Sequence, residues 1–231
     1  MVFPLKGFTF DWYIEMWNKA RLHQALWNSI KVGVIASIIS TFIALFAAKA
    51  FTRYRVKYSG LSYGAILLPF IIPEIIIAVA FIVIWTSMGL KLGLVPITIS
   101  HILYCTPFCL LILISRMDGF DKSLEEASMD LGENIFGTFW RVTFPLLLPG
   151  IIASLLLSFV ISFDEFILAF FLSSSDQTLP IYMWSQLRFP KKLPHVLALG
   201  AIIIVATSFI VMLSYWFRNL GQSNNNRGSH I

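Results

Sequence analysis

Charged residues are scarce in this sequence. Lysine, arginine, aspartate and glutamate together make up 13% of its 231 residues, whereas hydrophobic residues make up 58%. A soluble domain of average composition is roughly 25% charged and roughly 45–50% apolar. The hydrophobic residues also occur in long blocks rather than evenly along the chain. These features indicate a single integral membrane domain.

Other absences exclude further classes of protein. The only two cysteines, Cys105 and Cys109, lie in one apolar block and cannot form a secreted-type disulfide framework. No run of five or six like charges occurs, so the net charge of +5 does not indicate nucleic-acid binding. The N-terminus lacks the basic start and apolar core of a signal peptide. The sequence also lacks a GxxxxGKS or GxxxxGKT phosphate loop, so we expect that this chain is not itself an ATP-hydrolysing enzyme.

Five segments are long and apolar enough to cross a bilayer, which takes about 20 mostly apolar residues. In lipid the backbone must satisfy its own hydrogen bonds, so these segments are expected to be helices. The predicted fold is therefore an all-α, polytopic transmembrane helical bundle. The spans are predicted at residues 26–50, 61–85, 94–115, 146–172 and 196–217.

The spans divide the chain into three regions. Residues 1–25 form an aromatic, amphipathic segment that is expected outside or at the membrane interface. Residues 26–217 form the transmembrane domain. Residues 218–231 are polar and are expected to form a disordered cytoplasmic tail.

Loop charges predict the orientation of the bundle. Residues 49–58 hold four basic residues and no acidic one, and short basic loops face the cytoplasm. This places residues 116–143 and the C-terminus inside and residues 173–195 outside, although three basic residues of the latter loop then lie outside. Five spans also leave the basic residues of the N-terminal segment outside. A preceding span with a cytoplasmic start would remove this difficulty.

Residues 116–143 carry the densest charge of the sequence, with six acidic and three basic residues. Ser123 and Glu126 have the spacing of a capping box at the start of a short helix. Gly132 suits a left-handed C-terminal cap, and Asn134 suits the cap of a second short helix that precedes the next span. The residues alone leave two interpretations open: a helical loop on the membrane surface, or a docking element for a cytoplasmic partner.

This segment resembles the EAA motif of ABC importer permeases, which combines Glu-Ala-Ala, a later glycine and an Ile-x-Leu-Pro ending. Four residues match the motif: Glu126, Ala127, Gly132 and Pro145. Three positions depart mildly from it: Ser128 for the second alanine, Val142 for the isoleucine and Phe144 for the leucine. From about residue 7 to 217, with segments such as SFDEFILAFFLS and TLPIYMWSQLR, the sequence looks like the C-type permease of spermidine/putrescine importers.

The resemblance implies the type I ABC importer permease fold, whose members have six spans, the first of which is not found here. It implies that residues 123–143 form coupling helices that dock on a separate ATPase subunit, which binds the ATP. The residues assigned to this coupling are Glu126, Ala127, Ser128, Gly132 and Pro145. A second permease subunit, a periplasmic substrate-binding protein and a multi-pass location in a bacterial inner membrane are also implied. No cofactor is expected on this chain.

Acidic residues within the spans are candidates for the transport path, because burying charge in lipid is costly. Glu74 follows Pro73 near the middle of the second span, where two prolines predict a kink. Asp164 and Glu165 lie in the outer half of the fourth span or at a re-entrant end. Trp184 could add a ring for cation–π contact with a polyamine. The alternative for each acid is structural: a polar helix interface for Glu74, and a polar cap at the outer membrane face for the other two.

Two further interpretations concern metals and other kinds of transporter. His101, Cys105 and Cys109 share one helix face, but one helix supplies only two close ligands, so no metal site is expected. The same machine could import another small solute, such as an amino acid, an oxyanion or iron. An ion-coupled secondary transporter using Glu74 and Asp164 is a further alternative; it predicts inverted repeats, and no second half resembles the first.

Overall fold

The computed structural model describes residues 9–54 and 57–220, and all regular structure within these ranges is helical. This confirms the predicted all-α fold. In chain order the elements are α1 (Asp11–Trp17), α2 (Ala20–Arg53), α3 (Ser59–Ile71), α4 (Glu74–Ser87), α5 (Leu94–Met117), α6 (Ser123–Asp130), α7 (Ile135–Thr138), the π-helical turn η1 (Phe139–Thr143), α8 (Phe144–Asp164), α9 (Ile167–Leu172), α10 (Leu179–Leu187), the 3-10 turn η2 (Pro190–Lys192) and α11 (Leu193–Leu220).

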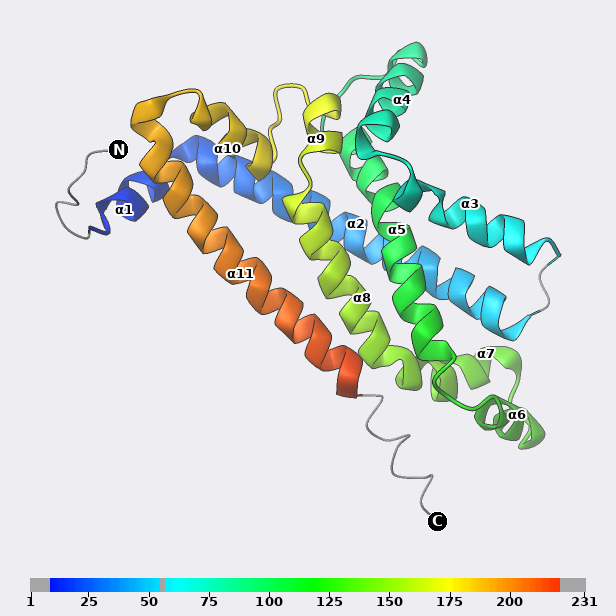
Figure 1. The fold of residues 1–231 in the computed structure, drawn as a ribbon. Coiled ribbons are helices and arrows are strands. Elements are labelled where there is room, and N and C mark those ends of the chain that lie inside the picture. Colours follow the sequence, from blue (N-terminus) through cyan, green and yellow to red (C-terminus); the bar gives the residue numbers. More distant parts are fainter. Residues whose placement is uncertain (1–8, 55–56, 221–231) are drawn as a thin grey trace.

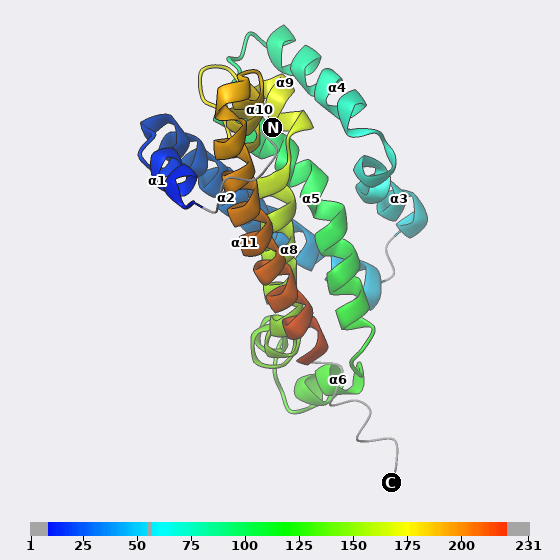
Figure 2. The same cartoon turned by 60° about the vertical axis from the view of Figure 1, so that its left-hand side comes forward.

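Three long helices, α2, α5 and α8, pack as the centre of the fold, and the long helix α11 lies along one side of it against α8 (Figures 1 and 2). Helix α2 contacts both α5 and α8, and its buried face is built from small residues such as Ala36, Ala44 and Ala48. Gly33 of the same helix passes the ring of Phe159 so closely that an added Cβ would lie 3.0 Å from it. Small residues let membrane helices approach one another, which matters because lipid supplies no hydrophobic drive for their association.

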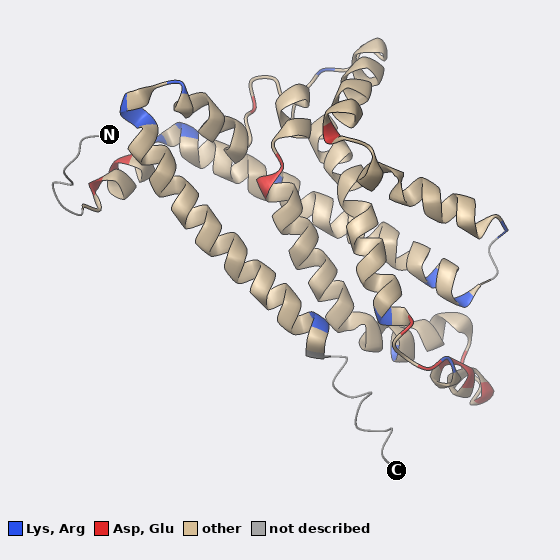
Figure 3. Ribbon diagram, viewed as in Figure 1, with Lys and Arg blue, Asp and Glu red and all other residues tan. Residues whose placement is uncertain are grey.

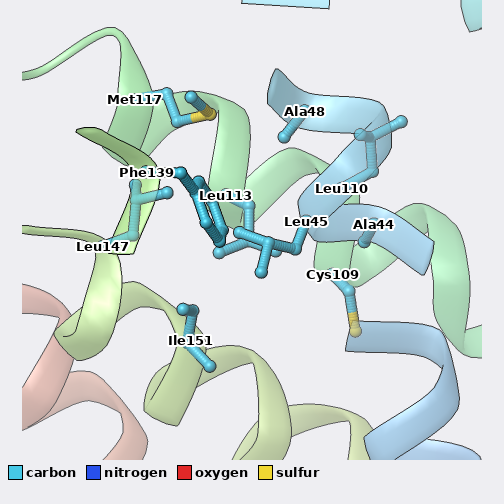
Figure 4. Close-up of a cluster of buried hydrophobic side chains, with 10 residues drawn as sticks. All are labelled: Ala44, Leu45, Ala48, Cys109, Leu110, Leu113, Met117, Phe139, Leu147 and Ile151. Atoms are coloured by element: carbon cyan, nitrogen blue, oxygen red, sulfur yellow. The ribbon is translucent and has the colours of Figure 1, made fainter. Parts of the chain in front are cut away.

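A cluster of buried apolar side chains joins α2, α5, η1 and α8 near the end of the bundle that carries α6 (Figure 4). Leu45, Leu113 and Leu147 come from three different helices and meet in this cluster, with Phe139 of the π turn among them. The cluster therefore holds the start of α8 firmly against the centre of the bundle.

The first, third and fifth predicted spans correspond to α2, α5 and α11, and each helix is longer than predicted. Helix α11 continues to Leu220, so the predicted tail boundary at residue 218 falls inside a helix. Residues 221–231 of that tail lie outside the described residues. Among the described residues, four helical stretches are long and apolar enough to span a membrane, and a bent pair would make a fifth: Ala20–Arg53, Leu94–Met117, Ile135–Asp164, Pro190–Asn219, and Ser59–Ile71 with Glu74–Ser87.

The second predicted span, residues 61–85, is not one continuous helix. Helices α3 and α4 meet at an angle of 102° across a short break after Ile71. Pro73 is the residue before α4 and adopts a non-helical backbone conformation. Because proline has no N–H and fixes its own φ, it suits this position and disrupts a continuous helix. The predicted kink is confirmed, and the structure shows that it is a complete break between two helices.

The fourth predicted span, residues 146–172, is wrong at both ends. Helix α8 ends at Asp164, and Glu165 has an extended backbone that separates it from α9. At the other end, residues 135–164 form one helical stretch, since α7 continues through η1 into α8. The second short helix that was predicted before Pro145 is therefore the beginning of the fourth span. The wide π turn ends at Thr143, two residues before Pro145, and accommodates a residue that cannot donate a helical hydrogen bond.

Candidate functional site

Helix α6 projects from one end of the bundle, and acidic residues gather on it and on its flanking turns (Figures 1 and 3). Glu126, Ala127 and Gly132, which the motif assigns to docking, are all exposed. Ser128 is half-buried, and its Oγ lies 3.1 Å from Thr138 Oγ1, a hydrogen bond that joins α6 to α7. Three of the predicted coupling residues are thus accessible, whereas the half-buried Ser128 attaches α6 to α7.

The start of α6 differs from the prediction. Lys122 occupies the N-cap position, and Ser123, already inside the helix, does not cap it. Instead, the backbone N–H of Ser123 donates to Asp121 Oδ1 at 3.0 Å. This backbone hydrogen bond, together with one from the Ser123 hydroxyl, lowers the pKa of Asp121 from its ordinary value. The predicted capping box of Ser123 and Glu126 is therefore wrong, because the N-cap is one residue earlier in the chain than the pattern implied.

The end of α6 and the start of α7 are as predicted. Gly132 has φ +95, in the left-handed region that favours glycine. Its N–H donates to Met129 O at 2.9 Å, and the next N–H, of Glu133, donates to Ser128 O at 3.2 Å. These two bonds form the Schellman motif that ends a helix. The side chain of Asn134 then accepts from Gly137 N at 2.8 Å and caps α7.

Large apolar side chains are exposed around this helical turn. Single exposed apolar residues are common, but a contiguous group marks a membrane or protein contact. A cavity of about 390 Å³ lies beside the group, between α2 and the α7–η1 segment. The exposed residues are Leu124, Met129, Leu131, Ile135, Phe136 and Trp140.

The residue that fastens α6 to the bundle is Glu125, which the sequence reasoning missed. Its side chain is buried, and Oε2 lies 2.6 Å from Nε of Arg53 at the end of α2. Its other oxygen accepts from the hydroxyl of Thr143 in η1. The clues in the sequence were the second glutamate beside Glu126 and the basic segment at residues 49–58, but neither indicated that the two would meet.

Pro145, the last predicted coupling residue, is exposed and lies at the start of α8 rather than on α6. It follows the π turn and belongs to the helix that continues from α7 into the fourth span. The proline ending of the motif therefore belongs to the helical stretch 135–164, which begins just after α6 and its terminal turn.

At the other candidate site, Glu74 begins α4 at the break of the bent pair. The hydroxyl of Tyr104 on α5 donates to Glu74 Oε1. Two phenylalanine rings extend this group: the Phe108 ring centroid lies 5.7 Å from that of Tyr104 and 5.1 Å from that of Phe70. The structure therefore places a half-buried carboxylate against the Tyr104 side chain, and a row of neighbouring rings continues from Tyr104 to Phe108 and Phe70.

Glu165 faces inward and stabilises the break between α8 and α9. Its two carboxylate oxygens accept from the backbone N–H groups of Leu168 at 2.8 Å and Ala169 at 3.0 Å, which caps α9. Its Oε2 also lies 3.1 Å from Nε2 of the buried His101, although that nitrogen is not aligned for a hydrogen bond. His101 Nδ1 is 2.7 Å from the hydroxyl of Ser162. These contacts support a structural role for Glu165 rather than a role in the transport path.

Asp164, although adjacent in sequence, points elsewhere. It is exposed and lines a cavity of about 300 Å³ between α8, α10 and α11, whose other lining residues are mostly apolar. Trp184 is also exposed, and its ring centroid lies 5.5 Å from that of Phe166. The two acids that were predicted to lie together beside aromatic rings therefore face different surroundings. Asp164 is accessible, as is Trp184, whereas Glu165 is buried.

The two cysteines of α5 pack within the bundle. Cys109 Sγ lies 3.6 Å from Ser40 Oγ and 3.5 Å from Thr41 Oγ1, both on α2. Cys105 Sγ lies 3.6 Å from the carbonyl oxygen of Ser158 on α8. These sulfurs contact the hydroxyl and carbonyl groups of neighbouring helices, whereas His101 on the same face contacts Glu165.

Comparison with known proteins identifies relatives along most of the chain. Over 210 residues it is 31% identical to the spermidine/putrescine transport system permease protein PotC of Haemophilus influenzae, covering 90% of this chain and 81% of that protein. The protein of the same name from Escherichia coli K12 is also 31% identical, with 79% of its length covered. The putrescine transport system permease protein PotI of Escherichia coli K12 is 26% identical over 219 residues, covering 91% of this chain and 77% of that protein.

Solved structures with the same fold include two transporters. A chain of a bacterial ABC transporter involved in the import of the acidic polysaccharide alginate superposes with a TM-score of 0.72 at 14% identity, covering 94% of this chain and 85% of that one. A chain of an amino acid ABC transporter superposes with a TM-score of 0.67 at 15% identity, covering 92% and 99%. These matches show that the fold is that of ABC importer permeases.

Residues 40–222 match the family described as the binding-protein-dependent transport system inner membrane component. The match includes the last part of α2 and every helix from α3 to α11. The chain therefore belongs to this family of multi-pass inner-membrane permeases, which transport rather than catalyse a reaction.

Proposed function

We propose that this chain is a permease subunit of an ATP-driven importer of polyamines, with spermidine or putrescine as substrate. The observation that carries the coupling part of the proposal is that Glu126 and Ala127 on α6, and Gly132 in the turn after it, are all exposed. The similarity to three permeases named for spermidine and putrescine transport supports the substrate.

In this proposal, α6 and the exposed apolar residues around it dock on an ATPase subunit in the cytoplasm. Glu126 offers a carboxylate to a basic partner group, and the small Ala127 permits close approach. The α6 end of the bundle and the C-terminus are then cytoplasmic, while α9 and α10 lie at the periplasmic end, where a binding protein delivers substrate. A second permease subunit completes the path. Closure of the ATPase subunits moves α6 as a rigid body and switches access across the membrane.

The accessible acids are proposed to line the cation path. A polyamine is a chain of ammonium groups, and each group is stabilised by a carboxylate and by the faces of aromatic rings. Glu74, with Tyr104 bonded to it and the rings of Phe108 and Phe70 following Tyr104, offers both kinds of contact. Asp164, in its mostly apolar cavity, offers a second carboxylate. Glu165 is not assigned to the path, since its oxygens already accept from α9.

The direct test is reconstitution of the complete complex in proteoliposomes, followed by uptake of labelled putrescine and spermidine. We expect ATP-dependent uptake that requires the binding protein, and no co-purification of the ATPase subunit with the Glu126→Arg variant. Uptake of an amino acid, oxyanion or iron instead of polyamines would refute the proposed substrate. Uptake that persists without ATP but stops when the proton gradient is collapsed would show a secondary transporter instead.

The path residues are tested by a matched pair of substitutions at one position. Tyr104→Phe removes only the hydroxyl that donates to Glu74, whereas Tyr104→Leu also removes the ring. A cation–π contact contributes about 0.5–1 kcal/mol at an accessible site, so the leucine variant should import polyamine about two- to fivefold more slowly than the phenylalanine variant. Equal rates for the two variants, together with an unimpaired Glu74→Gln variant, would remove this group from the path.

A further inference from the structure

Five parts of the chain meet at the ion pair of Arg53 and Glu125. Arg53 Nε lies 2.6 Å from Glu125 Oε2, and its Nη2 donates to the carbonyl oxygen of Met117 at 3.2 Å. The guanidinium carbon lies 4.7 Å from the ring centroid of Phe120. The second carboxylate oxygen accepts from the hydroxyl of Thr143. Both charged side chains are about nine-tenths buried, with exposed fractions of 9% and 10%.

These contacts belong to separate elements. Arg53 is the last residue of α2, and Met117 is the last residue of α5. Phe120 lies in the turn before α6, Glu125 lies on α6, and Thr143 ends the π turn that leads into α8. One carboxylate therefore connects the projecting helix directly to α2 and to the start of α8, and connects it to α5 through the arginine.

Few other polar contacts attach α6 to the bundle. Its remaining side-chain hydrogen bond to another helix, among the described residues, is the one from Ser128 to Thr138 of α7. Lys49, one turn before Arg53 on α2, lines the same cavity as Arg53 and Glu125. Its charge is close enough to interact with both, although its ammonium also lies 4.4 Å from the ring centroid of Phe139. The exposed face of α6 thus carries the docking residues, and Glu125 on its buried face carries the attachment.

We propose that Arg53 and Glu125 are positioning residues that transmit the movement of docked α6 to α2, α5 and α8. This inference rests on the proposed docking of α6 with the ATPase subunit. Charge-assisted hydrogen bonds to a planar guanidinium fix direction as well as distance. A displacement of α6 therefore displaces the ends of the helices that share the pair. Replacement of Arg53 or Glu125 by an uncharged residue leaves α6 able to dock but only loosely connected to the membrane spans.

The test compares transport with ATP hydrolysis in the reconstituted complex. We expect Glu125→Gln and Arg53→Gln to keep binding-protein-stimulated ATP hydrolysis while uptake per ATP hydrolysed falls by about fivefold or more, the lower range of typical coupling between sites. Arg53→Lys keeps the charge but not the fork that reaches Met117, so its loss should be smaller. The double variant should lose no more than the more severe single variant, because both remove the same interaction.

A matched control is available at the same end of the bundle. Arg141 and Glu133 form a second arginine–glutamate pair, in which the arginine side chain is 75% exposed. Exposed pairs contribute little, so Arg141→Gln should keep the wild-type ratio of uptake to hydrolysis.

Co-purification of the ATPase subunit and the thermal midpoint of the complex are measured for each variant. If a variant loses the ATPase subunit, the pair acts in docking and the inference is overturned. If uptake and hydrolysis fall in proportion, or if the ratio stays unchanged, the pair has a structural role only and the inference is also overturned. A wild-type complex that fails to import polyamine at all would instead refute the proposed function.

Discussion

Replacement of Gly132 tests why the turn after α6 needs glycine. The reason could be its backbone conformation, or the lack of space for a side chain. The residue has φ +95, and a Cβ built there would meet nothing within 4 Å. An alanine at this position therefore introduces no collision. The alanine must instead adopt the left-handed backbone conformation, which destabilises an ordinary residue by about 1–2 kcal/mol. Asparagine tolerates that region better than alanine.

The magnitude follows from this backbone cost. Since about 1.4 kcal/mol corresponds to a tenfold change in an equilibrium constant, Gly132→Ala should weaken the native turn by about five- to thirtyfold. The proposed docking needs the native arrangement of α6, so the ATPase concentration for half-maximal assembly should rise by up to that factor. Gly132→Asn should lie between alanine and wild type.

Gly60 and Gly64 on α3 provide the matched controls. A Cβ at either position would also meet nothing within 4 Å, and neither has φ in the left-handed region. Titration of the ATPase subunit into permease variants, read by assembly and by uptake in proteoliposomes, compares all four substitutions. If alanine at 132 behaves like alanine at 64, or if asparagine is as damaging as alanine, then the backbone reasoning fails.

Substitutions at three further positions test the packing, each read as the thermal midpoint and urea resistance of the purified complex in detergent. Leu113→Ala removes a fully buried side chain of the α2–α5–α8 cluster and should destabilise by about 2–5 kcal/mol; an unchanged midpoint would mean that the cluster is not packed as described. Gly33→Ala places a Cβ 3.0 Å from the Phe159 ring and should cost about 1–3 kcal/mol, and a neutral result would show that the ring moves freely. Glu165→Ala leaves the two N–H groups that it caps without a partner, at about 1–3 kcal/mol each, whereas Glu165→Gln should cost less. Equal effects of Ala and Gln would count against the capping role.

The sequence by itself determined the features that depend on local composition. Long apolar blocks predicted the membrane helices, since a span needs only enough apolar residues to cross the bilayer. Gly132 and Asn134 were predicted correctly as caps, because the bonds that they make lie within a few residues of them. Pro73 indicated a kink for the same local reason, although not the size of the 102° bend.

Only the tertiary structure decided which polar groups meet across the fold. Arg53 and Glu125 are 72 residues apart in the chain, and the sequence indicated neither as the partner of the other. Asp164 and Glu165 are neighbours with the same chemistry, yet one is exposed and the other is buried against α9. Their different roles arise from the break between α8 and α9, which turns one carboxylate inward. Such assignments depend on how helices pack, and hydrophobic patterns specify that a helix is buried without specifying what it is buried against.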